Sequence, residues 1–127
     1  RVKLKYLDVD NEKRRKLAKY YSDELSDLPI QLPSIRAEVE PVFHLFVVQV
    51  ENRQGLLKYL KEESIFAGVH YLLPVHLQPA YQDRIQTASD MSNSESIIKK
   101  IISLPIYPEL SINDAKKIVF TLKFFFN

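Results

Sequence analysis

The stretch HLFVVQV, residues 44–50, is an apolar run rich in β-branched side chains, and it has the length of one β-strand. A continuous run of this kind predicts a central strand that is buried on both faces. Such a strand cannot stand alone, because each covered face needs another element packed against it. The segments on either side must therefore supply covering helices and neighbouring strands.

The segment RVKLKYLDVDNEKRRKLAKYYSDEL, residues 1–25, predicts a helix that starts at the first residue of the chain. Its inward positions recur at spacings of three and four: Leu7, Arg14, Leu17, Ala18, Tyr21 and Leu25. Pro29 and Pro33 end the helix, because proline has no amide hydrogen to continue it. No capping residue precedes this helix, so we expect the chain to be a piece of a longer protein.

A short amphipathic helix is expected from about Asn52, which is a plausible N-cap, with Leu56, Leu57 and Leu60 facing inward. The following segments predict, in order, a strand over residues 65–71, a mobile polar loop over 82–96, a helix over 95–102 and a short extended piece at a sheet edge over 103–110.

The last helix has the clearest pattern. Ser111 and Asp114 form a start that resembles a capping box. One apolar face follows it, made by Ala115, Ile118, Val119, Leu122, Phe125 and Phe126. Together these elements predict a small α+β fold in which helices cover a sheet of about three strands.

Composition excludes several classes of protein. A chain of 127 residues is one domain, long enough to bury a core without disulfides or metal. A net charge of +2, spread over mixed runs of both signs, does not indicate a nucleic-acid-binding surface. No apolar run is long enough for a membrane span. The start of the chain also lacks the apolar core of a signal peptide, so we expect a cytoplasmic protein. The absence of cysteine agrees with a reducing compartment.

The stretch GVHYLLPVHLQPAY, residues 68–81, holds two of the three histidines of the chain, His70 and His76. Two histidines without cysteine or a nearby carboxylate fall short of a zinc site, so we predict no metal. The sequence has no G-x-S-x-G motif and only two glycines, which argues against a serine hydrolase and a glycine-rich phosphate loop. We therefore expect no catalytic residue in this chain alone.

Three segments in this order resemble the C-terminal region of the DegT/StrS family of pyridoxal phosphate-dependent sugar aminotransferases: LDVDNEKRRKLAKYYSDEL, then VFHLFVVQVENRQGLLKYLKEESIFAGVHYLLPVHLQPAY, then ISLPIYPELS. The resemblance covers nearly all of the chain. It implies that residues 1–127 are the single small C-terminal domain of a fold type I enzyme of the aspartate aminotransferase type. The large N-terminal domain, which carries the Schiff-base lysine and the cofactor-binding groups, is absent from the chain.

In this family the H-Y-P loop of the small domain lies over the cleft between the domains. The resemblance therefore implies that His70 and Tyr71 bind substrate, and that His76 matches the second histidine of the motif. This chain departs from the family at Leu72, where proline usually follows the H-Y pair.

The resemblance implies a ping-pong transamination in the full-length enzyme, in which glutamate gives its amino group and a nucleotide-linked keto deoxysugar receives it. Pyridoxal phosphate would be bound by the full-length homodimer and not by this piece. The expected products feed polysaccharide or lipopolysaccharide synthesis. Two alternatives stay open: a sugar dehydratase of the same family, and a free-standing interaction domain without catalysis.

Overall fold

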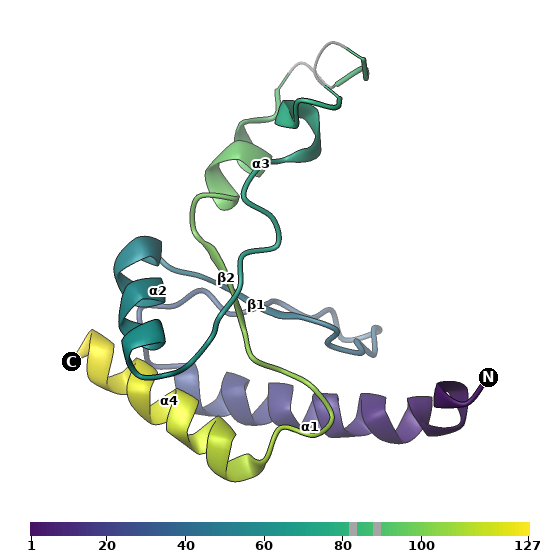
Figure 1. Cartoon of the computed structure of the whole chain (residues 1–127), viewed down its shortest axis with the longest axis vertical. Coiled ribbons are helices and arrows are strands. Elements are labelled where there is room, and N and C mark those ends of the chain that lie inside the picture. Colours follow the sequence, from purple (N-terminus) through teal and green to yellow (C-terminus); the bar gives the residue numbers. More distant parts are fainter. Residues whose placement is uncertain (82–83, 88–89) are drawn as a thin grey trace.

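The computed structural model describes residues 1–81, 84–87 and 90–127. The elements run in the order η1 (Lys3–Tyr6), α1 (Leu7–Leu25), β1 (Phe46–Gln49), α2 (Arg53–Glu62), η2 (Val75–Leu77), α3 (Ser92–Ile97), β2 (Ile101–Leu104) and α4 (Ile112–Phe126). Helices α1 and α4 pack on each other, and α2 contacts both α4 and β2 (Figure 1). The expected α+β class is confirmed. None of the described helices is long and apolar enough to cross a membrane.

Helix α1 follows the predicted apolar spacing over most of its length. Leu17, Ala18, Tyr21 and Leu25 are buried, whereas Leu7 is exposed. Arg14 reaches across the fold and donates to the Ile106 carbonyl over 3.2 Å. The chain enters α1 through a 3-10 turn rather than as an α-helix from its first residue. The helix ends at Leu25, before the prolines that were expected to stop it.

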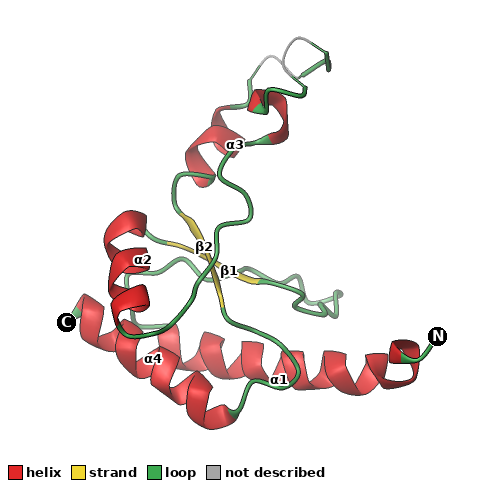
Figure 2. Ribbon diagram, in the orientation of Figure 1, coloured by secondary structure: helices red, strands yellow, loops and turns green. Residues whose placement is uncertain are grey.

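The sheet consists of β1 and β2 paired antiparallel, with Phe46 opposite Leu104 and Gln49 opposite Ile101 (Figure 2). Burial alternates along β1, so one face is fully buried and the other only partly. The expectation that both faces would be fully buried was therefore wrong. An antiparallel pair with helices packed mainly on one face leaves the other face half-open.

Among residues 1–81, 84–87 and 90–127 the sheet has two strands and not the expected three or so. The strand expected over residues 65–71 is reduced to one bridge between Gly68 and Ser103, and a second isolated bridge joins Gln31 to Gln49 on the opposite edge. Glycine weakens a strand because it has no side chain to pack. The chain accordingly leaves the sheet after Gly68.

The helix expected over residues 95–102 was also wrong. Helix α3 ends at Ile97, and Ile101 and Ile102 belong to β2. Ile102 is fully buried in the strand, so pairing with β1 outweighs the helical spacing of the isoleucines. The extended piece expected over residues 103–110 is a strand only to Leu104, because Pro105 has no amide hydrogen for the ladder.

Both predicted helix caps are confirmed. The Asn52 side chain accepts a hydrogen bond from the Gly55 amide at 3.0 Å, which caps α2. The Ser111 hydroxyl accepts from the Asp114 amide at 3.1 Å and donates to the Asp114 carboxylate at 2.6 Å. These bonds satisfy amides that would otherwise lack partners at a helix start.

One hydrophobic core joins α1, β1, α2, β2 and α4. The Tyr21 and Phe46 rings meet at its centre, with centroids 5.3 Å apart. The Tyr21 hydroxyl donates to the Pro105 carbonyl over 2.9 Å, and burial raises the pKa of this phenol. None of the described residues within 69–100 belongs to this core. We call the described residues within 69–100 the arm and the described residues outside this range the body; Figure 1 shows the arm projecting away from the helices of the body.

The polar loop expected over residues 82–96 falls partly outside the described residues, at 82–83 and 88–89. Its end is helical, because α3 begins at Ser92. The Ser92 amide donates to the Asp90 carboxylate over 2.8 Å, and hydrogen bonding from Ser92 lowers the pKa of that carboxyl group.

Candidate functional site

His70 lies where the arm leaves the body. Its Nδ1 is 2.9 Å from the hydroxyl of Ser103 on β2. The backbones of Gly68 and Ser103 exchange two hydrogen bonds, of 3.0 and 2.8 Å, two residues before His70. The ring is thus tied to the edge of the sheet, although His70 as a whole is exposed.

Tyr71 presents its ring beside His70. The two ring centroids are 5.7 Å apart, and the planes meet edge to face at 83°. Tyr71 remains 69% exposed, so its hydroxyl is available to a ligand. The structure therefore brings together two of the three predicted site residues as a neighbouring pair of polar aromatic rings.

His76 lies elsewhere, in the short helix η2. Its Nε2 is 3.0 Å from a carboxylate oxygen of Glu95 on α3, and its side chain is only 10% exposed. Among the described residues, no hydrogen bond or ring contact joins His76 to His70 or Tyr71. In this structure His76 holds two parts of the arm together, and a substrate contact for it stays a prediction.

Sequence reasoning missed Ser103 and Glu95, the partners of the two histidines. Each lies far along the chain from its histidine, with separations of 33 and 19 residues. A single serine in an apolar strand and a glutamate in a polar segment give no signal of their own. Their roles depend on the register of β2 and on the position of α3.

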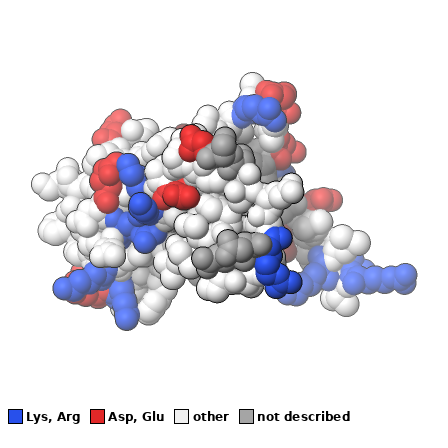
Figure 3. Space-filling view, turned by 90° about the horizontal axis from the view of Figure 1, so that it is seen from above, with Lys and Arg blue, Asp and Glu red and all other residues white. Residues whose placement is uncertain are grey.

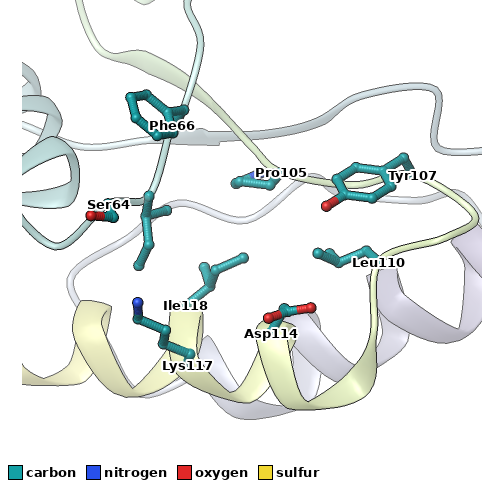
Figure 4. Close-up of a pocket in the computed structure, with 9 residues that line it drawn as sticks. Ser64, Phe66, Pro105, Tyr107, Leu110, Asp114, Lys117 and Ile118 are labelled. Atoms are coloured by element: carbon teal, nitrogen blue, oxygen red, sulfur yellow. The ribbon is translucent and has the colours of Figure 1, made fainter.

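A hollow of about 270 Å³ lies in the body between residues 64–66, residues 105–110 and the start of α4. Figure 4 shows the Tyr107 ring directed over this space, above Leu110 and Asp114. A larger hollow of about 690 Å³ runs along the N-terminal half of α1, with Tyr6, Arg14 and His44 among its lining residues. Neither hollow includes the three predicted site residues.

Charge does not mark a site on the face seen in Figure 3, where basic and acidic side chains are interspersed around a broad uncharged area. Within the described residues, no group of three or more histidine, cysteine or acidic side chains could hold a metal ion. Charged side chains of the body form ion pairs with neighbours in space, such as Lys123 with Glu24 at 2.7 Å. The hydrogen bond to Glu24 raises the pKa of Lys123.

The glycines of the chain do not provide a phosphate cradle for a cofactor. The Gly55 amide is bonded to the Asn52 side chain, and the Gly68 amide is bonded to the Ser103 carbonyl. Backbone amides that bind phosphate must point into an open concavity. Both glycine amides are bonded within the fold, so neither contributes to such a concavity.

Comparison with known sequences gives a consistent result. Residues 1–123 match the DegT/DnrJ/EryC1/StrS aminotransferase family. The chain is 40% identical over 124 residues to the erythromycin biosynthesis sensory transduction protein EryC1 of Saccharopolyspora erythraea, covering 97% of this chain and 34% of that protein. It is 38% identical over 118 residues to the dTDP-3-amino-3,6-dideoxy-alpha-D-galactopyranose transaminase of Aneurinibacillus thermoaerophilus, covering 93% of this chain and 32% of the relative.

Solved structures agree with the sequence comparison. The crystal structure of DesV from S. venezuelae, in complex with a ketimine intermediate, superimposes with a TM-score of 0.92 at 35% identity. The match covers 98% of this chain and 34% of DesV. The chain thus spans about a third of the length of the proteins it resembles.

Proposed function

The chain belongs to the DegT/DnrJ/EryC1/StrS aminotransferase family, and we propose that it is the small C-terminal domain of a pyridoxal phosphate-dependent aminotransferase acting on a nucleotide-linked keto sugar. The transaminases among its relatives, named for dTDP-linked amino sugars, support this substrate class. The observation that carries the proposal is the exposed pair of His70 and Tyr71 at the edge of the sheet.

This chain would recognise the sugar rather than carry out the chemistry. An imidazole and a phenol supply neutral donors and acceptors, which suit sugar hydroxyls and phosphate oxygens. The Ser103 bond and the neighbouring Tyr71 ring restrict His70, so less side-chain freedom is lost when a ligand binds. Pyridoxal phosphate, held by the rest of the enzyme, would supply the electron sink for amino transfer.

The body offers a surface that a large domain would cover. The N-terminal turn and the start of α1 expose a series of apolar side chains, namely Val2, Leu4, Tyr6, Leu7 and Val9. Exposed apolar patches of this kind are typical of surfaces that pack against other protein. This surface supports a large domain elsewhere in the full-length protein. On the family resemblance alone, the proposal also includes a cytoplasmic homodimer, glutamate as amino donor, and a product used in polysaccharide or lipopolysaccharide synthesis.

The test uses the protein from the full open reading frame, supplied with pyridoxal phosphate, glutamate and a dTDP-linked keto deoxysugar. We expect an absorbance band of bound cofactor that glutamate bleaches, and an aminated sugar in the mass spectrum. Bound cofactor that glutamate leaves unchanged would favour the dehydratase of the same family. A full-length product that binds no cofactor would favour a non-catalytic interaction domain.

Variants of the site sharpen this test. Replacing Tyr71 by phenylalanine or His70 by alanine should raise KM for the nucleotide sugar about tenfold, while the reaction with glutamate alone keeps its rate. Tyr81, a partly exposed tyrosine of the same arm, provides the matched control, and its replacement by phenylalanine should change neither. An equal loss of activity in the half-reactions with the sugar and with glutamate would contradict a role in recognising the sugar.

A further inference from the structure

We propose that Ser103 and Gly68 are positioning residues that hold the His70 ring in one orientation and one tautomer, with its Nε2–H available as a donor to an acceptor oxygen of the substrate. The inference rests on the proposed function for the identity of that substrate. The state of the ring itself follows from the geometry around Ser103 and can be measured separately.

The tautomer follows from the hydroxyl of Ser103. Ser103 is only 5% exposed, and within the described chain its hydroxyl has one hydrogen-bond partner, Nδ1 of His70. A buried hydroxyl proton without an acceptor is costly. If Nδ1 carried the ring proton, it would donate to Ser103 and leave the hydroxyl proton without an acceptor. The hydroxyl therefore donates to Nδ1, and the proton of the neutral ring resides on Nε2.

The direction of that proton follows from the shape of imidazole. The two ring nitrogens project in widely diverging directions from either side of Cε1. Because Nδ1 faces the buried hydroxyl on β2, Nε2 is directed away from the strand. His70 is exposed at this position, so a ligand that approaches the edge of the sheet meets an N–H donor.

Gly68 makes room for this orientation. A Cβ atom at residue 68 would lie 2.7 Å from Cε1 of His70 and 3.4 Å from its Nδ1. The first distance is shorter than real carbon atoms tolerate, so any side chain at this position displaces the ring. Gly68 does not have a positive φ angle, so alanine would disturb the ring by its volume and not through backbone strain.

A fixed N–H donor favours ligands that present an acceptor oxygen to it. It complements a phosphate oxygen, a carbonyl oxygen or a hydroxyl oxygen of a nucleotide-linked sugar, and it cannot accept a hydrogen bond from a sugar hydroxyl. Preorganisation by Ser103 means that binding does not have to select one tautomer and one rotamer from several. His76 cannot replace this donor in the structure, because its own Nε2 is bonded to Glu95.

The first experiment measures the tautomer in the chain of residues 1–127, by long-range proton–nitrogen correlation NMR at a pH where the ring is neutral. In the wild type we expect His70 to show the correlation pattern of the Nε2–H tautomer. In Ser103→Ala and Gly68→Ala we expect the patterns of a mixture of both tautomers. Thr121→Ala is the matched control, because Thr121 is a buried residue with a hydroxyl group, also 5% exposed, and lies on α4. An Nδ1–H pattern in the wild type, or unchanged tautomers in both variants, overturns the proposal.

The second experiment measures steady-state kinetics of the full-length enzyme. Ser103→Ala should raise KM for the nucleotide sugar about fivefold, with an unchanged half-reaction with glutamate, and Thr121→Ala should leave both unchanged. If the enzyme aminates the sugar but Ser103→Ala leaves KM unaltered, the positioning role is wrong and the proposed function stands. If the enzyme does not aminate sugars, the proposed function fails, and the donor role toward substrate fails with it.

Discussion

The body and the arm are held together by different kinds of interaction. The body encloses a continuous apolar core in which Tyr21, Phe46 and Leu122 are fully buried. The described part of the arm contributes nothing to that core and is held by polar contacts. Within the arm His76 bonds to Glu95, and the arm is joined to the body by His70 to Ser103, Arg53 to the Ile98 carbonyl and Lys100 to Glu51. Figure 1 shows the consequence, an arm that projects from a packed body.

This difference separates stability from recognition. Burial of apolar area supplies most of the free energy of folding, so the body determines whether the chain folds. Polar contacts in an exposed segment contribute little free energy but fix geometry. The candidate site lies at the junction, where His70 belongs to the arm and its partner Ser103 to a strand of the body. A change in one region should therefore leave the other largely intact.

The largest effect is expected for Phe46→Ala in the body. The Phe46 side chain is fully buried against Tyr21, so its loss leaves a cavity in the core. We expect the free energy of unfolding to fall by about 3–5 kcal/mol, measured by urea denaturation. Phe120→Ala is the control, because Phe120 is 70% exposed and should cost less than ~0.5 kcal/mol. Similar losses in both variants would contradict a core located as described.

A smaller effect is expected for Tyr21→Phe, which removes the hydroxyl that binds the Pro105 carbonyl. We expect a loss of about 1–2 kcal/mol at neutral pH, because a partly buried acceptor loses its partner. In the wild type, burial raises the pKa of Tyr21, so the unfolded phenol ionises first, near pH ~10. This stabilising contribution is complete below that pH and is lost as the pH rises above it.

Tyr21→Phe should therefore flatten the decline of stability in alkaline solution. Urea midpoints measured from about pH 8 to pH 11 test this expectation. Tyr81→Phe is the control, because Tyr81 is in the arm and partly exposed. An alkaline decline that persists unchanged in Tyr21→Phe would show that other groups cause it.

A still smaller loss of stability is expected for Ser111→Ala, which removes the N-cap of α4. The hydroxyl binds the Asp114 amide and carboxylate, so its loss should cost about 1 kcal/mol in thermal denaturation. Ser26→Ala is the matched control. Ser26 is an exposed serine at the C-terminal end of α1, and its replacement should change stability by less than ~0.5 kcal/mol. A cap effect as small as the control would mean that water replaces the hydroxyl.

The body was largely predictable from sequence, and the reasons are local. Asn52 and Ser111 are caps whose preference for helix starts is a property of their own side chains. The face of α4 followed from apolar spacing, and Ala115, Ile118, Val119 and Leu122 are indeed buried. The second strand was not predictable in this way, because Ile101 and Ile102 pair with residues about fifty positions earlier in the chain.

The candidate site likewise contains residues that the sequence could indicate and residues that it could not. Sequence and family resemblance pointed to His70 and Tyr71, and the structure places their rings side by side. Sequence could not supply Ser103, because its contact with His70 depends on which residue of β2 faces Gly68. Register of this kind is set by tertiary pairing and leaves no local pattern. The same holds for Glu95, which reaches His76 only after α3 has packed beside η2.

The smallest effect is expected for Glu95→Gln in the arm, and it tests whether arm and body open independently. The His76–Glu95 pair joins η2 to α3, but Glu95 is 45% exposed, so water screens the pair and it contributes no more than ~1 kcal/mol. We expect amide hydrogen exchange in η2 and α3 to rise up to about fivefold, while exchange in α1 and α4 stays unchanged. Glu62→Gln, a similarly exposed carboxylate on α2, should change neither region. Equal acceleration in arm and body would mean that the two open as one unit, and the separation of recognition from stability would then be wrong.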